Sequence, residues 1–207
     1  MNIEKEFLAY ECGYKNGLDD VANQAPDVEE ILTIVGIFKS LDDWRQERGL
    51  QHTVGNIAAN IGEEIVEYLR AENDEHHVDA LCDIFVFSVN AISAMGEREY
   101  ASLAMNLSMS TYEINERSYF AEIINRFCLI AKFGYTLNID ALITIAICAK
   151  AQLCNAGYDF LIAMDETLKE IHSRTGAWND TTQKWEKFRT PEAMDLWYEA
   201  DYSKAKL

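Results

Sequence analysis

Apolar residues recur every three or four positions through most of the chain, which is the spacing of one face of an α-helix. The first such stretch covers residues 28–48, with Asp27 as a predicted cap and Gly49 as its end. The same pattern predicts further helices at residues 52–73, 75–95, 118–132, 140–155 and 160–175. Asn115 is an alternative start for the fourth of these, and Asp159 is the predicted cap of the last.

Proline supports the helical interpretation, because the long span between Pro26 and Pro191 contains none. Residues 141–149, ALITIAICA, also fit a buried strand, although the helical runs on both sides favour a helix. We therefore predict an all-α fold, a multi-helix bundle in one domain. Its predicted parts are an N-terminal arm (1–25), a helical core (28–175) and a C-terminal basic and aromatic extension (176–207).

Charge narrows the range of partners. The chain has 207 residues, 35 of them acidic and 18 Lys or Arg, for a net charge of −17. Such a surface opposes binding to nucleic acid or to an anionic membrane. The five cysteines include no CxxC pair, and Cys82, Cys128 and Cys148 lie in apolar runs, so we expect small core residues in a reducing cytoplasm.

The most informative stretch is residues 62–90, where two groups of acids lie inside apolar helical patterns. Glu63, Glu64 and Glu67 come first, and Asp79 and Asp83 follow a polar break. Residues three or four apart share a helix face, so each group points one way. If the break turns the chain back, the two groups meet between two antiparallel helices, with Asn90 two turns beyond Asp83.

Clustered carboxylates repel one another unless a cation compensates them. Oxygen ligands suit Mg²⁺ or Mn²⁺, which protein carboxylates usually share with a substrate phosphate. The pattern thus predicts a divalent-metal site for a phosphorylated ligand. The alternative is a solvated acidic helix face, which is common in so acidic a chain.

The motifs EEIVE and DALCDIFVFSVNA resemble the signature of the MazG-like superfamily of all-α nucleoside triphosphate pyrophosphohydrolases. That pattern is EExxE on one helix and ExxD on the next. Glu63, Glu64, Glu67 and Asp83 match it, whereas Ala80 stands where the second helix would carry Glu, and the neighbouring Asp79 could replace it. The resemblance covers residues 28–95 and, less fully, 158–206.

The resemblance implies an enzyme that converts an NTP or dNTP to the monophosphate and pyrophosphate with Mg²⁺ (or Mn²⁺). It implies Glu64, Glu67, Asp79 and Asp83 as metal ligands, and Glu63, Glu64, Glu67 and Asp83 as catalytic residues. Glu63 would accept the proton of the attacking water. It also implies a homodimer or higher oligomer, because active sites of the family commonly combine helices of different subunits.

Basic residues gather near the C-terminal end. Arg174, Lys184 and Lys187 are candidates for binding substrate phosphates, with ordinary surface charge as the alternative. Two other classes of function remain open. Ala80 favours a helical protein that binds a nucleotide or partner without catalysis, and a purely structural bundle would bind neither metal nor nucleotide.

Overall fold

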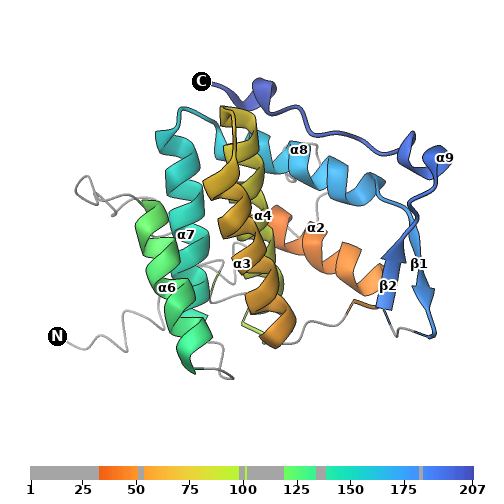
Figure 1. The fold of residues 1–207 in the computed structure, drawn as a ribbon, viewed down its shortest axis with the longest axis horizontal. Coiled ribbons are helices and arrows are strands. Elements are labelled where there is room, and N and C mark those ends of the chain that lie inside the picture. Colours follow the sequence, from red (N-terminus) through yellow and green to blue (C-terminus); the bar gives the residue numbers. More distant parts are fainter. Residues whose placement is uncertain (1–32, 51–53, 98–100, 102–118, 134–138, 182–183) are drawn as a thin grey trace, which may run out of the picture. The chain divides into compact units, whose positions relative to one another are not determined.

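The computed structural model describes residues 33–50, 54–97, 101, 119–133, 139–181 and 184–207. The predicted arm at residues 1–25 and the cap at Asp27 lie outside these residues. The described part is mostly helical, which confirms the predicted all-α multi-helix bundle. Its main helices are α2 (Ile34–Glu47), α3 (Val54–Arg70), α4 (Asp74–Ala94), α6 (Tyr119–Phe133), α7 (Ile139–Asn155) and α8 (Phe160–Ser173) (Figure 1).

Most helix ends agree with the sequence pattern. Gly96 follows α4 with φ 81°, a left-handed conformation that glycine adopts without strain. The Asp159 side chain accepts hydrogen bonds from the N–H groups of Leu161 and Ile162 and so caps α8 as predicted. Two boundaries were wrong. Helix α2 begins at Ile34, because Thr33 is extended (φ −122°) and caps the helix through Gly36 N–H. The helix predicted to reach residue 73 ends at Arg70, because Asn73 is the extended cap of α4.

Helix α4 is the centre of the bundle. It contacts α2, α3, α7, α8 and the short helix η2 (Tyr202–Ala205). This explains its nearly continuous apolar sequence, since a helix covered on several sides needs no polar face. By length and composition alone α4 could cross a membrane, a property that buried core helices share, and most of its apolar window is buried here.

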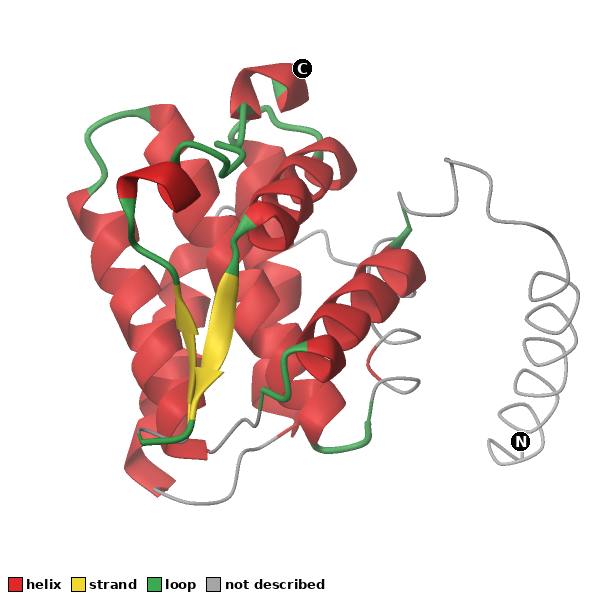
Figure 2. Ribbon diagram, turned by 90° about the vertical axis from the view of Figure 1, so that its right-hand side faces the viewer, coloured by secondary structure: helices red, strands yellow, loops and turns green. Residues whose placement is uncertain are grey.

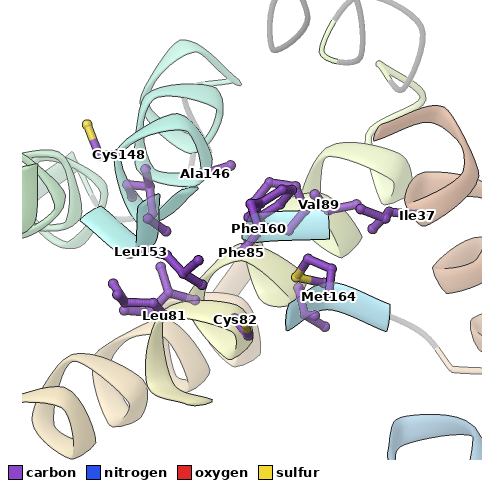
Figure 3. Packing of buried hydrophobic residues seen from close by; sticks show 14 of the residues in the cluster. Ile37, Leu81, Cys82, Phe85, Val89, Ala146, Cys148, Leu153, Phe160 and Met164 are labelled. Atoms are coloured by element: carbon purple, nitrogen blue, oxygen red, sulfur yellow. The ribbon is translucent and has the colours of Figure 1, made fainter. Parts of the chain in front are cut away.

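The core around α4 is closely packed (Figure 3). Leu81, Phe85 and Val89 of α4 are buried, as are Leu153 of α7 and Phe160 of α8. The rings of Phe85 and Phe160 meet edge to face with 4.9 Å between centroids. The strand alternative for residues 141–149 is therefore wrong, because they lie inside α7.

The predicted cysteine environments were right in two cases of three. Cys82 and Cys148 are buried, whereas Cys128 is exposed on α6. Its apolar neighbours in sequence, Phe127 and Leu129, are themselves only partly buried or exposed. An apolar run that covers more than one helix face does not reveal which of its members faces solvent.

The C-terminal segment contains structure that periodicity did not predict. Strands β1 (Gly176–Asn179) and β2 (Lys184–Lys187) pair antiparallel and form a hairpin beside the helices, in yellow in Figure 2. A short helix, α9 (Pro191–Met194), follows. The chain then returns to the α7–α8 turn, where Asp159 N–H donates to Ala205 O (2.7 Å) and Leu207 N–H to Gly157 O (2.8 Å).

Candidate functional site

Helices α3 and α4 form a helical hairpin that brings the two predicted groups of acids together. Only residues 71–73 connect them, and the helices pack against each other (Figure 1). The break turns because Asn73 is extended and its side chain accepts from His76 N–H (2.9 Å), which starts a new helix. So short a connection makes the two helices antiparallel. Of the predicted acids, Glu67 is the nearest to the turn on α3, and Asp79 is the nearest on α4.

The Glu64 side chain gives the clearest evidence that the acids of α3 and α4 lie together. Its side chain is buried, with the residue 9% exposed. Burial raises its pKa to about 8, and the charges of Asp83, Glu67, Asp79 and Glu63 add to the shift. The other four predicted acids therefore lie within electrostatic reach of Glu64. Without a compensating cation, Glu64 is largely protonated at neutral pH.

Asp83 shows the same effect on the facing helix. Burial raises its pKa to about 7, Asp79 raises it further, and Arg174 and Lys187 oppose the shift. Asp79 also has a raised pKa, through burial first. Glu170, at the end of α8, raises the pKa of both aspartates and was not predicted from sequence. Its only sequence signal is the i,i+4 spacing to Arg174, its ion-pair partner.

The acids lie near one another without forming a tight cluster. Within the ranges that the structure describes, no three His, Cys, Asp or Glu side chains are gathered tightly enough to hold a metal. Glu63 and Glu67 are exposed on α3, whereas Glu64 is buried. The donor set is nevertheless the one that Mg²⁺ and Mn²⁺ prefer, since it consists of carboxylate oxygens with unbalanced negative charge.

The side chains of Asp79 and Ala80 point in different directions from α4. Ala80 is 2% exposed and packed in the core, whereas Asp79 is partly exposed and acts electrostatically on Glu64 and Asp83. Position 80 therefore points into the bundle and Asp79 faces the acids. This supports Asp79 as the residue that supplies the second-helix oxygen.

Two of the three predicted basic residues lie near the acids. Arg174 follows the last turn of α8 and pairs with Glu170. Lys187 ends β2; burial lowers its pKa, Arg174 and Arg189 lower it further, and Asp83 opposes them. Neighbouring positive charges that lower the pKa of a lysine repel one another, so an anion that binds between them is favoured. Arg189 was not predicted, and the side chain of Lys184 lies outside the described residues.

Tyr202 is the contact that sequence reasoning missed altogether. Its hydroxyl donates to Asp79 Oδ1 at 2.8 Å, although the two residues are 123 positions apart. Burial raises the pKa of the phenol well above its ordinary value, so it remains a donor. No local pattern signals such a contact, because only the return of the C-terminal segment creates it.

Two other features surround the acids. A shallow, open pocket of about 340 Å³, called the α3 groove below, lies on the exposed side of α3. It is lined by Ala59, Gly62, Glu63, Val66, Glu67 and Arg70. On α4, Asn90 is 2% exposed and its Oδ1 has no hydrogen-bond partner. Asn90 lies on the face that carries Asp83, as the sequence spacing predicted.

A second buried acid belongs to a different kind of site. Glu166 of α8 is 1% exposed and accepts hydrogen bonds from Lys169 Nζ (2.9 Å), Lys204 Nζ (3.1 Å) and Asp201 N–H (3.1 Å), as well as from the Tyr198 hydroxyl. Burial alone would raise its pKa, but these donors lower it to about 2. Glu166 thus anchors the C-terminal segment to α8.

Comparisons of the chain with protein-family models, with curated proteins and with solved structures returned no match.

Proposed function

We propose that this protein is a Mg²⁺-dependent nucleoside triphosphate pyrophosphohydrolase, which cleaves between the α and β phosphates to release a monophosphate and pyrophosphate. The observation that supports this most is the pKa of about 8 at Glu64, raised by burial and by four neighbouring carboxylates on α3 and α4. The charges that shift the pKa of Glu64 are all carboxylates, and Arg174 and Lys187 offset only part of the repulsion at Asp83, so negative charge remains that a divalent ion would balance.

Glu64, Glu67, Asp79 and Asp83 would hold the ion, or Mn²⁺ in its place. Glu64 and Asp83 start from buried or partly buried positions, and the exposed Glu67 side chain would rotate towards them. When bound, the metal supplies positive charge to the triphosphate and makes water more acidic. Glu63, exposed beside the α3 groove, would accept the proton of the attacking water.

Arg174 and Lys187 would bind the phosphates of the substrate. Both act electrostatically on Asp83 from the α8–β2 side of the site. A phosphate chain bound beside Asp83 would therefore be attracted by these two cations as well as by the metal. Lys184, on the same strand as Lys187, remains a candidate of the same kind.

A homodimer or higher oligomer is part of the same proposal. The α3 groove lies open beside Glu63 and Glu67, so a helix of a second copy would complete the site there. Light scattering coupled to size exclusion measures the mass in solution. A strictly monomeric protein with full activity would contradict this part of the proposal.

The deciding experiment is a panel of NTPs and dNTPs assayed with Mg²⁺ or Mn²⁺ and with chelator. We expect equal amounts of monophosphate and pyrophosphate from at least one nucleotide, and none with chelator. Release of orthophosphate without pyrophosphate would contradict the reaction type.

A second candidate is a nucleotide-binding protein without catalysis, which Ala80 in place of the usual Glu favours. Tight binding of a triphosphate in calorimetry, with no product from any nucleotide of the panel, would select this candidate. Absence of both binding and product would leave a structural bundle.

A further inference from the structure

The C-terminal segment reaches the acidic site through one residue. Tyr202 opens η2, is 4% exposed, and donates its hydroxyl proton to Asp79 Oδ1 at 2.8 Å. Its hydroxyl also lies 3.0 Å from Thr167 Oγ1 of α8, which in turn lies 3.0 Å from Ala163 O. A phenol has one proton, so its bond to Asp79 leaves Thr167 as the donor to Tyr202 or to Ala163 O.

Tyr202 is held in place on both sides of the chain. Ahead of it, Glu166 binds Tyr198 and the Asp201 N–H group. Behind it, Ala205 O accepts from Asp159 N–H. The phenol therefore approaches Asp79 from a fixed direction. A side chain oriented in this way restricts the rotamers of its partner carboxylate and engages only one of its oxygens, Oδ1.

We propose that Tyr202 is a positioning residue that orients Asp79 as a metal ligand, in the role that a glutamate at position 80 would otherwise fill. The inference rests on the proposed function, since it assumes that the acids of α3 and α4 bind a divalent ion. Groups that hydrogen-bond to a metal-ligating side chain set its orientation, and their loss typically weakens metal binding by about 10- to 100-fold. An aspartate is shorter than a glutamate, so its direction matters more.

The test is a titration of the full chain with Mn²⁺ alone, followed by electron paramagnetic resonance of the free ion. Tyr202→Phe keeps the ring and removes only the hydroxyl. We expect it to weaken Mn²⁺ binding by about 10- to 100-fold. Tyr158→Phe is the matched control: its ring is also buried (2% exposed) and its backbone pairs with Lys206 of the same segment. It should bind Mn²⁺ like the wild type.

A double-mutant cycle separates positioning from packing. In an Asp79→Ala background, Tyr202→Phe should weaken Mn²⁺ binding no further, because its partner is gone. An equal loss in both backgrounds would overturn the proposal, as would Mn²⁺ binding by Tyr202→Phe within about twofold of the wild type.

The outcomes also distinguish this inference from the function beneath it. If the wild type binds Mn²⁺ and Tyr202→Phe binds equally well, only the role of Tyr202 fails. If the wild type binds no Mn²⁺ at all, the metal site fails and this inference with it. Should Tyr202→Phe not fold, Thr167→Val removes the hydroxyl that contacts the phenol. We then expect a loss of Mn²⁺ affinity in the same direction, and unchanged affinity would contradict the positioning role of Tyr202.

Discussion

Glu64 and Glu166 are both buried glutamates, yet their pKa values lie on opposite sides of the ordinary value of 4.5. The pKa of Glu64 is raised to about 8, and that of Glu166 is lowered to about 2. Burial raises the pKa of both, so the partners decide the difference. Two lysines, a phenol and a backbone N–H contact Glu166, whereas other carboxylates surround Glu64. The first arrangement stabilises the fold, and the second has negative charge that an added cation would balance.

The largest expected effect follows from removing one charge of the acidic site. Asp83→Asn should lower Mg²⁺-dependent pyrophosphate release by about 100-fold or more, because a metal ligand is lost. Its metal-free melting temperature should stay the same or rise, because repulsion with Asp79 is removed. Glu72→Gln, at an exposed acid after α3, is the control and should retain activity. A fall in stability with intact activity would reverse our assignment of the two regions.

Removing the charge of the other buried glutamate, Glu166, should affect stability rather than activity. Glu166→Gln keeps the shape but loses the charge that Lys169, Lys204 and Tyr198 contact. We expect it to lower the free energy of unfolding by about 2 kcal/mol in urea denaturation. Glu64→Gln, the same substitution in the other region, should be neutral or stabilising without metal. If both variants lost the same free energy of unfolding, Glu64 and Glu166 would not differ in their contribution to stability.

The two acids should also shape the pH dependence of metal-free stability in opposite directions. Glu166 has a depressed pKa, so its contribution is present above 4.5 and is lost as pH falls towards about 2. Glu64 and Asp83 have raised values of about 8 and 7, so stability falls as pH rises from their unfolded values through that window. Melting curves at intervals of pH measure both slopes.

The variants separate these slopes. Glu64→Gln should flatten the decline on the alkaline side, and Glu166→Gln the decline on the acid side. Mg²⁺ should stabilise the wild type more as pH rises, because bound metal competes with protons for the same carboxylates. A stabilisation by Mg²⁺ that is independent of pH would place the ion elsewhere.

The smallest effect is expected at the basic side of the site. Lys187→Gln should raise the KM for the triphosphate about fivefold with little change in kcat, because one contact of about 1 kcal/mol to a phosphate is lost. Lys39→Gln, at an exposed position of α2, is the control. A fall in kcat alone would indicate that Lys187 acts on the leaving group rather than on binding.

Local pattern was sufficient for the helices and for the acids that each helix contributes. The i,i+3 and i,i+4 spacings among Glu63, Glu64 and Glu67, and between Asp79 and Asp83, depend only on helical geometry, and a short polar break after Arg70 forces neighbouring helices together. Hydrophobic periodicity predicted less well the features that depend on tertiary packing. It extended α2 past the cap at Thr33, placed Cys128 in the core, and contained no sign of the β1–β2 hairpin.

The sequence by itself thus determined an all-α bundle and two acidic faces on adjacent helices, because both follow from residues close together in the chain. The tertiary structure decided the rest. It turned Asp79 rather than position 80 towards the acids, brought Arg174 and Lys187 to Asp83, and set Tyr202 against Asp79 across 123 positions. It also decided that Glu64 lies among like charges and Glu166 among opposite ones. Burial and distant neighbours control these properties, and neither is encoded in local spacing.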